Sequence, residues 1–342
     1  MRHVSASPTS QWQDFAKSTD PGQWVDDPLG DGFSYTTLPL RDDGDAPTLA
    51  TLVRYRRTGF KRLLDRPRAV VLSVHGWSDY FYNPELAHFY AGQHVAFYAL
   101  DLRRFGRSLR VEHELPGFVS DLSIYDEELA AVLEIIEAEH PGLPLVLHGH
   151  SLGGLVLCLW LARTGRSAAG LVLNSPWLEF QGTAFLRAPM KGLLEAMARG
   201  NPRRKLRLPE VDTYWRSMSA EGEGWWDLHR VWRPMKAFPA TAGWLSTVLE
   251  GHAVIAKGLA LELPIFVATS KRTHFSLQYA SDIQSTDSVI DAVQTRARAL
   301  QLGSLVTLCT IESAMHDVFA SAPAPRAEAY RSLGRWLPMA LG

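Results

Sequence analysis

The chain has 342 residues, of which 46% are hydrophobic, so it can bury a substantial core, and this composition argues against intrinsic disorder. Its 35 basic and 36 acidic residues give a formal net charge of -1. The chain as a whole therefore has no net positive potential that would attract nucleic acid, and a neutral small-molecule substrate fits this charge balance. Cys158 and Cys309 lie in apolar runs, which indicates that they are reduced thiols and not partners in a disulfide. No apolar run reaches the roughly 18 residues of a membrane span. We therefore expect a cytoplasmic protein without a transmembrane segment.

Short apolar runs alternate with helical patterns, which predicts an α/β fold with a mostly parallel central sheet and helices on both faces. Two segments, 35–40 and 48–56, predict an antiparallel pair at the leading edge of the sheet. Runs without alternation suit strands that are buried on both faces. On this basis we expect central strands at 69–76, 95–102, 144–151, 170–176, 264–270 and 305–311, and a clear amphipathic helix at 121–140.

Residues 177–255 break this alternation, since they hold helical patterns, prolines and many tryptophans but no convincing strand. We interpret them as an inserted helical cap that divides one core into an N-terminal part, 1–176, and a C-terminal part, 256–342. An apolar inner face would shield an apolar ligand, although ordinary helix packing explains buried tryptophans equally simply. We interpret the basic stretch 201–207 as a solvent-exposed edge of the cap. The alternative is that it makes transient contact with a membrane surface.

The segment 145–162, LVLHGHSLGGLVLCLWLA, places Ser151 between a strand and a helix. Gly149 and Gly153 remove the Cβ atoms that would clash in so tight a turn. The pattern G-x-S-x-G in this context predicts a nucleophile elbow, from which Ser151 Oγ projects at the carboxyl edge of the sheet. The N–H of Leu152, at a helix N-terminus, points to the same space and can stabilise an anion.

A serine nucleophile needs a base, and the base needs an acid that fixes its tautomer. We choose His316 as the base because it follows the last predicted strand in a short loop. Three candidate acids, Asp282, Asp287 and Asp291, follow the penultimate strand. We choose Asp287, with Asp282 and Asp291 as alternatives, because the spacing D-x-V-x-D at 287–291 is typical of an acid at the end of a loop with a helix beginning after it. A second oxyanion donor is expected from the backbone N–H of Trp77, which follows the strand that ends in His75-Gly76.

The motifs HGWSDY, DLRRFGRS, GHSLGG, DSVID and AMHDVF together resemble an α/β-hydrolase of the monoacylglycerol lipase, lysophospholipase and serine aminopeptidase-like branch. The order Ser, Asp, His is also that of α/β-hydrolases. Two motifs depart from the family. The loop that usually reads D-x-x-G-x-G-x-S is altered at 101–108, and residues 271–286 separate the penultimate strand from the acid.

The resemblance implies the α/β-hydrolase fold, no metal or organic cofactor, and Ser-His-Asp acyl transfer on a carboxylic ester, with a lipid-like ester such as a monoacylglycerol or lysophospholipid as first choice. Amide or peptide hydrolysis, and acyl transfer to a second alcohol, are the alternatives on the same residues. The serine at the elbow disfavours dehalogenases and epoxide hydrolases, whose nucleophile is a carboxylate. A binding protein without catalysis is disfavoured because Ser151, His316 and a candidate acid are all present. The oligomeric state does not follow from the sequence.

Overall fold

A computed structural model describes residues 15–20, 22–42, 47–59, 66–180 and 184–342. Its centre is a nine-stranded sheet in the order β1-β2-β3-β5-β4-β6-β7-β8-β9. The first strands are β1 (Val25–Asp26), β2 (Phe33–Pro39) and β3 (Leu49–Tyr55). The pairs β1–β2, β2–β3 and β3–β5 are antiparallel. The predicted antiparallel pair is therefore confirmed, but β1 lies outside it and forms the true edge. With two residues, β1 is too short to show a pattern.

The remaining strands are parallel and lie where the apolar runs predicted them. They are β4 (Ala69–Val74), β5 (Val95–Asp101), β6 (Leu145–His150), β7 (Gly170–Asn174), β8 (Ile265–Ser270) and β9 (Val306–Ile311). The prediction that the last of these runs is a central strand is wrong. β9 is the outer strand of the sheet, and most of its residues are exposed or half-buried, because an apolar run by itself does not reveal an edge position.

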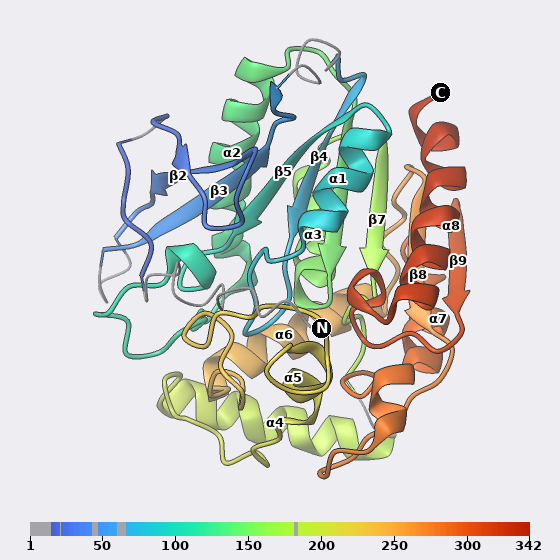
Figure 1. The fold of residues 1–342 in the computed structure, drawn as a ribbon. Helices are drawn as coiled ribbons and strands as arrows, with labels where there is room; N and C mark the ends of the chain where they lie inside the picture. Colours follow the sequence, from blue (N-terminus) through green and yellow to red (C-terminus); the bar gives the residue numbers. More distant parts are fainter. Residues whose placement is uncertain (1–14, 21, 43–46, 60–65, 181–183) are drawn as a thin grey trace, which may run out of the picture.

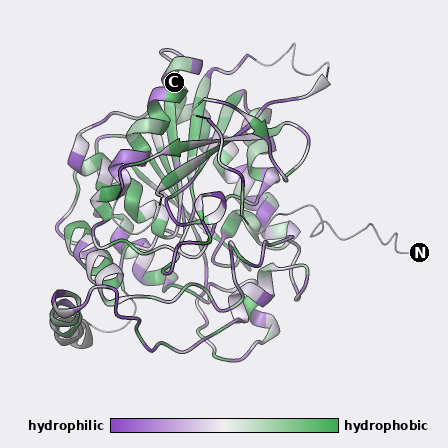
Figure 2. Ribbon diagram, turned by 90° about the vertical axis from the view of Figure 1, so that its left-hand side faces the viewer, coloured by the Kyte–Doolittle hydropathy of each residue, from purple (hydrophilic) through white to green (hydrophobic). Residues whose placement is uncertain are grey.

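Helices cover both faces of the sheet, and each face has its own hydrophobic core (Figures 1 and 2). On one face lie α1 (Pro84–Gly92) and α8 (Pro323–Leu341). On the other lie α2 (Tyr125–Glu139) and α3 (Leu152–Thr164). The predicted helix at 121–140 begins with a 3₁₀ turn, Leu122–Ile124, before α2.

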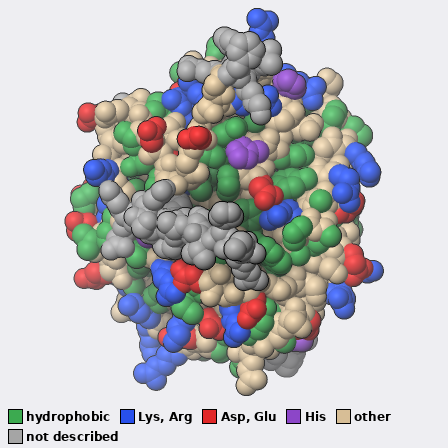
Figure 3. Space-filling model, viewed as in Figure 1, with side chains coloured by type: hydrophobic (Ala, Val, Ile, Leu, Met, Phe, Trp, Pro, Cys, Tyr) green, Lys and Arg blue, Asp and Glu red, His purple; other side chains and the backbone are tan. Residues whose placement is uncertain are grey.

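Between β7 and β8 the chain forms α4 (Ala184–Gly200), α5 (Thr213–Met218) and α6 (Ala242–Ile255). These helices lie together beyond the carboxyl ends of the parallel strands (Figure 1). After β8, α7 (Ala292–Ala299) leads to β9. The surface carries acidic and basic side chains interspersed, as Figure 3 shows for one face, in keeping with the near-zero net charge. No helix among the described residues is long and apolar enough to cross a membrane.

Candidate active site

Ser151 lies in the turn between β6 and α3, with φ 49° and ψ -115°. A positive φ is rare for a residue with a side chain and marks local strain that the surrounding structure must hold. Two backbone hydrogen bonds hold it: the Ser151 N–H donates to the Asn174 carbonyl at 3.0 Å, and the Ser151 carbonyl accepts the Trp177 N–H at 3.0 Å. The turn therefore has the backbone geometry expected of a nucleophile elbow.

The neighbouring glycines are required by space. A Cβ on Gly153 would lie 2.4 Å from the carbonyl oxygens of Val74 and His75, and one on Gly149 would lie 2.6 Å from the Gly154 Cα. These contacts are with backbone, which cannot move aside as a flexible side chain would. The glycines thus allow α3 to pack directly on the end of β4.

His316 and Asp287 form a buried pair at the same edge of the sheet. The distance from His316 Nδ1 to Asp287 Oδ2 is 2.9 Å, and the side chains are 2% and 0% exposed. The other oxygen, Asp287 Oδ1, accepts the N–H groups of Val289 and Ile290 at 2.9 and 2.8 Å. With Nδ1 donating to the carboxylate, Nε2 carries the lone pair and can accept a proton.

The two alternative acids lie elsewhere. Asp282 Oδ2 is 2.5 Å from Nδ1 of His274, and both side chains are more than 40% exposed. Asp291 caps α7, where its Oδ1 accepts the N–H groups of Val293 and Gln294. The structure therefore brings Asp287, and neither alternative, to His316.

His316 Nε2 is buried, and among the described residues it has no hydrogen-bond partner. It lies close to the elbow, since the His316 and His150 ring centroids are 4.9 Å apart. A hydrogen bond from Ser151 Oγ to this nitrogen is not formed here, and such bonds are often long before substrate binds. Nε2 is left as an unused acceptor beside the nucleophile turn.

The two expected oxyanion donors come from separate loops. Gly76 lies against the elbow, since a Cβ on it would be 3.1 Å from Ser151 Cβ, and Trp77 is the next residue. Within the described ranges, the N–H groups of Trp77 and Leu152 donate no hydrogen bond. The His75 side chain is held by two hydrogen-bond contacts: its Nδ1 is 2.7 Å from the Gly76 carbonyl oxygen, and its Nε2 accepts the Leu102 N–H at 3.1 Å.

The altered loop at 101–108 is held by buried charge. Arg107 pairs with Asp27 at 2.5 Å and with Asp101 at 2.8 Å, and all three side chains are 0% exposed. Burial disfavours the cation, but the two carboxylates outweigh it and raise the pKa of Arg107. Sequence reasoning did not identify this network, because Asp27 is 80 residues from Arg107.

An aromatic cluster lies beside the elbow. Its rings are those of Trp77, Phe105, Trp177, Phe238 and Trp244. The Trp77 and Trp244 ring centroids are 3.7 Å apart, and those of Trp77 and Phe105 are 5.6 Å apart. Three of the five residues lie between β7 and β8, so this segment brings apolar surface to the edge where Ser151 lies.

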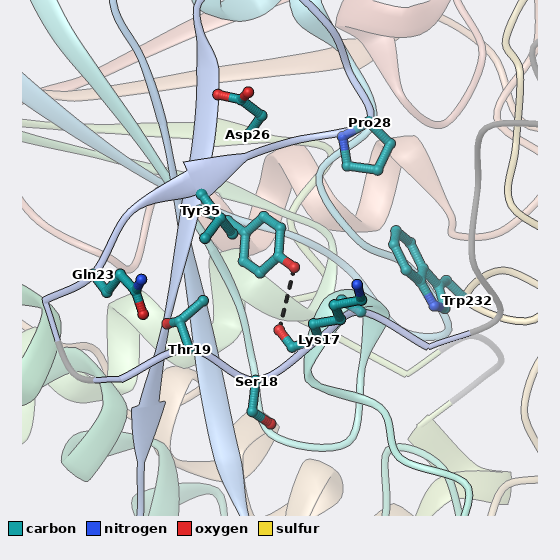
Figure 4. Close-up of a pocket in the computed structure, with 10 residues that line it drawn as sticks. Lys17, Ser18, Thr19, Gln23, Asp26, Pro28, Tyr35 and Trp232 are labelled. Atoms are coloured by element: carbon teal, nitrogen blue, oxygen red, sulfur yellow. Dashed lines mark hydrogen bonds between the residues drawn. The ribbon is translucent and has the colours of Figure 1, made fainter.

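A pocket of about 400 Å³ lies elsewhere, between the first described residues and Trp232 (Figure 4). Tyr35 closes one side, where its hydroxyl donates to the Lys17 carbonyl. None of the candidate catalytic residues lines this pocket, so it is distinct from the site around Ser151. In the part of the chain that the structure describes, no three His, Cys, Asp or Glu side chains are grouped so that they could hold a metal ion.

Comparison with known proteins gives a consistent picture. Residues 65–232 match the family model described as serine aminopeptidase, S33. Monoacylglycerol lipase from Mycolicibacterium smegmatis is 32% identical over 112 residues, which are 32% of this chain and 38% of that protein. Human monoglyceride lipase is 32% identical over 111 residues, 32% of this chain and 35% of that protein. The chain thus matches little more than a third of the length of these relatives.

The fold is shared over a longer range. A soluble variant of monoglyceride lipase from Saccharomyces cerevisiae, solved with a substrate analog, superposes with a TM-score of 0.58 and 14% identity. That match covers 89% of this chain and 96% of that structure. The resemblance predicted from the motifs is confirmed: the chain has the α/β-hydrolase fold, and its sequence is similar to the monoacylglycerol lipase and serine aminopeptidase branch of that superfamily.

Proposed function

We propose that the chain is a serine hydrolase that cleaves carboxylic esters, with Ser151 as nucleophile, His316 as base and Asp287 as acid. The observation that carries the proposal is the buried Asp287–His316 pair, whose free Nε2 lies beside the strained turn at Ser151. Nucleophile, base and orienting acid on three separate loops are the parts that acyl transfer requires.

The reaction takes two steps. His316 Nε2 takes the proton from Ser151 Oγ as the oxygen attacks the ester carbonyl, and the N–H groups of Trp77 and Leu152 stabilise the oxyanion. The histidine then protonates the leaving alcohol. In the second step, His316 takes a proton from water as the water attacks the acyl-enzyme, and the proton returns to Ser151 as the acid leaves. Asp287 holds the imidazole in the required tautomer throughout.

A lipid-like ester is the favoured substrate class. The curated relatives in the comparison are named as lipases, among them the monoacylglycerol lipase of Mycolicibacterium smegmatis. In the aromatic cluster beside Ser151, Trp77 and Trp177 are half-buried, so their rings offer apolar surface that an acyl chain can cover. We propose that residues 177–255 form the cap that supplies this surface.

The two free cysteines, Cys158 and Cys309, support a reducing compartment such as the cytoplasm.

The first test measures hydrolysis of p-nitrophenyl esters from acetate to palmitate. Ser151→Ala should lower kcat by at least about 10³-fold, and Asp287→Asn by about 10³- to 10⁴-fold, since an asparagine would hold the wrong tautomer. Asp291→Asn is the matched control, because asparagine also caps helices. It should stay within about twofold of wild type, as expected for a residue outside the site.

A fluorophosphonate probe separates a wrong substrate class from a wrong mechanism. Labelling at Ser151 without turnover of any ester would keep the nucleophile and move the substrate to amides or peptides. Products that carry the acyl group on added glycerol would favour an acyltransferase. A wild-type protein that the probe does not label would contradict the proposal.

A further inference from the structure

Asn174 is the last residue of β7, and its backbone holds the nucleophile turn. Its carbonyl oxygen accepts the Ser151 N–H at 3.0 Å, and the same oxygen is 3.1 Å from Nδ1 of His150. The residue is 3% exposed, and β7 is paired on both sides, with β6 and with β8. The position of Asn174 is therefore fixed by the centre of the sheet.

The side chain of the same residue holds the histidine loop. Asn174 Nδ2 donates to Asp317 Oδ1 at 2.7 Å, and Asn174 Oδ1 accepts the Val318 N–H at 3.0 Å. The orientation of the amide follows from its partners, because the reverse orientation would place oxygen against carboxylate and N–H against N–H. Asp317 directly follows His316. Asn174 is therefore hydrogen-bonded both to the turn that carries Ser151 and to the loop that carries His316.

Asp317 is a suitable anchor because its carboxylate is fully engaged. Its second oxygen accepts the Tyr82 hydroxyl at 2.7 Å, and the side chain is buried. Burial opposes ionisation, but the His150 ring, the donors on Tyr82 and Asn174, and nearby Arg233 outweigh it and lower the pKa of Asp317. An ionised acceptor makes a stronger hydrogen bond than a neutral one.

We propose that Asn174 is a positioning residue that sets the distance between Ser151 and His316, by fastening the 317–318 backbone to the nucleophile turn. This inference rests on the proposed function. Ser151 and His316 are on different loops, and here no hydrogen bond joins Ser151 Oγ to the buried Nε2. Their alignment therefore depends on the residues that connect the loops, and a displacement of about 1 Å can lower turnover by about 10²-fold.

An exchange of the two side chains tests the connection. Asn174→Asp places a second carboxylate 2.7 Å from Asp317 and should push the histidine loop away. In the double variant with Asp317→Asn, the amide at 317 can donate to the carboxylate at 174, while Val318 and Tyr82 keep their acceptors. All three hydrogen bonds are thus restored with one direction reversed. The double variant should recover what Asn174→Asp loses.

The readout is kcat on p-nitrophenyl butyrate for each active site that a fluorophosphonate probe labels. Asn174→Asp should lower this kcat about 10- to 100-fold with KM within about threefold, and the double variant should return to within about threefold of wild type. A purely structural role would instead reduce the labelled fraction and the unfolding temperature and leave kcat for each labelled site unchanged. If Asn174→Asp does not fold, Asn174→Ala replaces it, since it removes the donor without adding a charge.

Asn83 provides the matched control. It is also buried, and its Nδ2 donates to the Phe319 carbonyl, but its hydrogen bonds do not reach the nucleophile turn. Asn83→Ala should lower stability and leave kcat for each labelled site unchanged. A wild-type kcat in Asn174→Asp, or a double variant as slow as the single one, would overturn the positioning role. Absence of labelling in wild type would instead overturn the proposed function itself.

Discussion

Gly153 shows how one residue constrains the elbow. It lies in the first turn of α3, and a methyl group there would overlap two backbone carbonyl oxygens at 2.4 Å. Helix propensity alone would favour alanine over glycine by roughly 1 kcal/mol. Here the steric clash outweighs this preference, because relief would require α3 to move away from β4 and would carry Ser151 with it.

Two glycine substitutions should therefore change stability in opposite directions. Gly153→Ala should lower the free energy of unfolding by at least about 2 kcal/mol, as overpacking against fixed backbone does. Gly192→Ala is the control, because Gly192 is exposed on α4 and a Cβ there meets nothing within 4 Å. It should raise the free energy of unfolding by about 0.5–1 kcal/mol. Urea titration of both variants measures this, and a loss of equal size in both would contradict the steric argument.

Motif and spacing were enough to select the residues whose contacts the structure shows. His316 was chosen from its loop after the last strand, and Asp287 from the D-x-V-x-D spacing; the two are 2.9 Å apart. Their catalytic roles stay a prediction. Asn174 and Asp317 were missed because their hydrogen bond spans 143 residues. The available signals were a polar residue at the end of an apolar strand and a second acid directly after His316.

At the scale of elements, the segment between β7 and β8 is tied to the core by a buried ion pair. Arg233 Nη1 is 2.5 Å from Asp79 Oδ1, and the side chains are 7% and 4% exposed. Asp79 follows Trp77 by two residues, and Ser78 Oγ accepts the Phe238 N–H at 3.0 Å. The segment is thus fastened beside the loop that carries the proposed oxyanion donor.

Removal of one partner from this pair should be costly. Arg233→Met leaves the Asp79 carboxylate buried without its cation, and loss of about 3–5 kcal/mol in the free energy of unfolding is expected. Asp79→Asn should have a similar effect. The double variant should lose much less than the sum of the single losses, because neither charge is then left alone. Chemical denaturation of the three variants measures the coupling, and additive losses would exclude a direct pair.

The sequence predicted the positions of strands and helices wherever burial requires an apolar run or an amphipathic pattern that extends over several residues. The six parallel strands and α2 were expected close to their observed bounds. β1 was missed because two residues carry no period, and β9 was misplaced because an apolar run does not distinguish an outer strand from a central one. The contacts of residues 177–255 with the core could not be predicted, because they join loops far apart in the sequence.

At the scale of the whole molecule, the sheet separates two cores, and β6 places a titratable side chain in the core that α1 and α8 cover. His148 is 1% exposed, its Nδ1 is 2.9 Å from the Tyr90 hydroxyl, and its ring lies against Phe319. Burial lowers the pKa of His148 from 6.5 to about 3, although Asp317 acts in the opposite direction. The imidazole is therefore neutral in the folded chain at neutral pH, where it links α1 to the centre of the sheet.

This lowered pKa makes the stability of the fold depend on pH. Below pH 6.5 the unfolded chain binds a proton at His148 that the folded chain does not, so stability is greatest above that value and falls as the pH decreases. Between pH 7 and pH 5 this group should lower the free energy of unfolding by about 2 kcal/mol. His148→Asn keeps a polar partner for Tyr90 but cannot titrate, so its free energy of unfolding should fall by about 2 kcal/mol less over the same interval. The exposed His94, replaced by asparagine, is the control and should keep the wild-type dependence. Urea unfolding at the two pH values decides, and equal pH dependence in wild type and His148→Asn would mean that the folded chain protonates His148 as readily as the unfolded chain does.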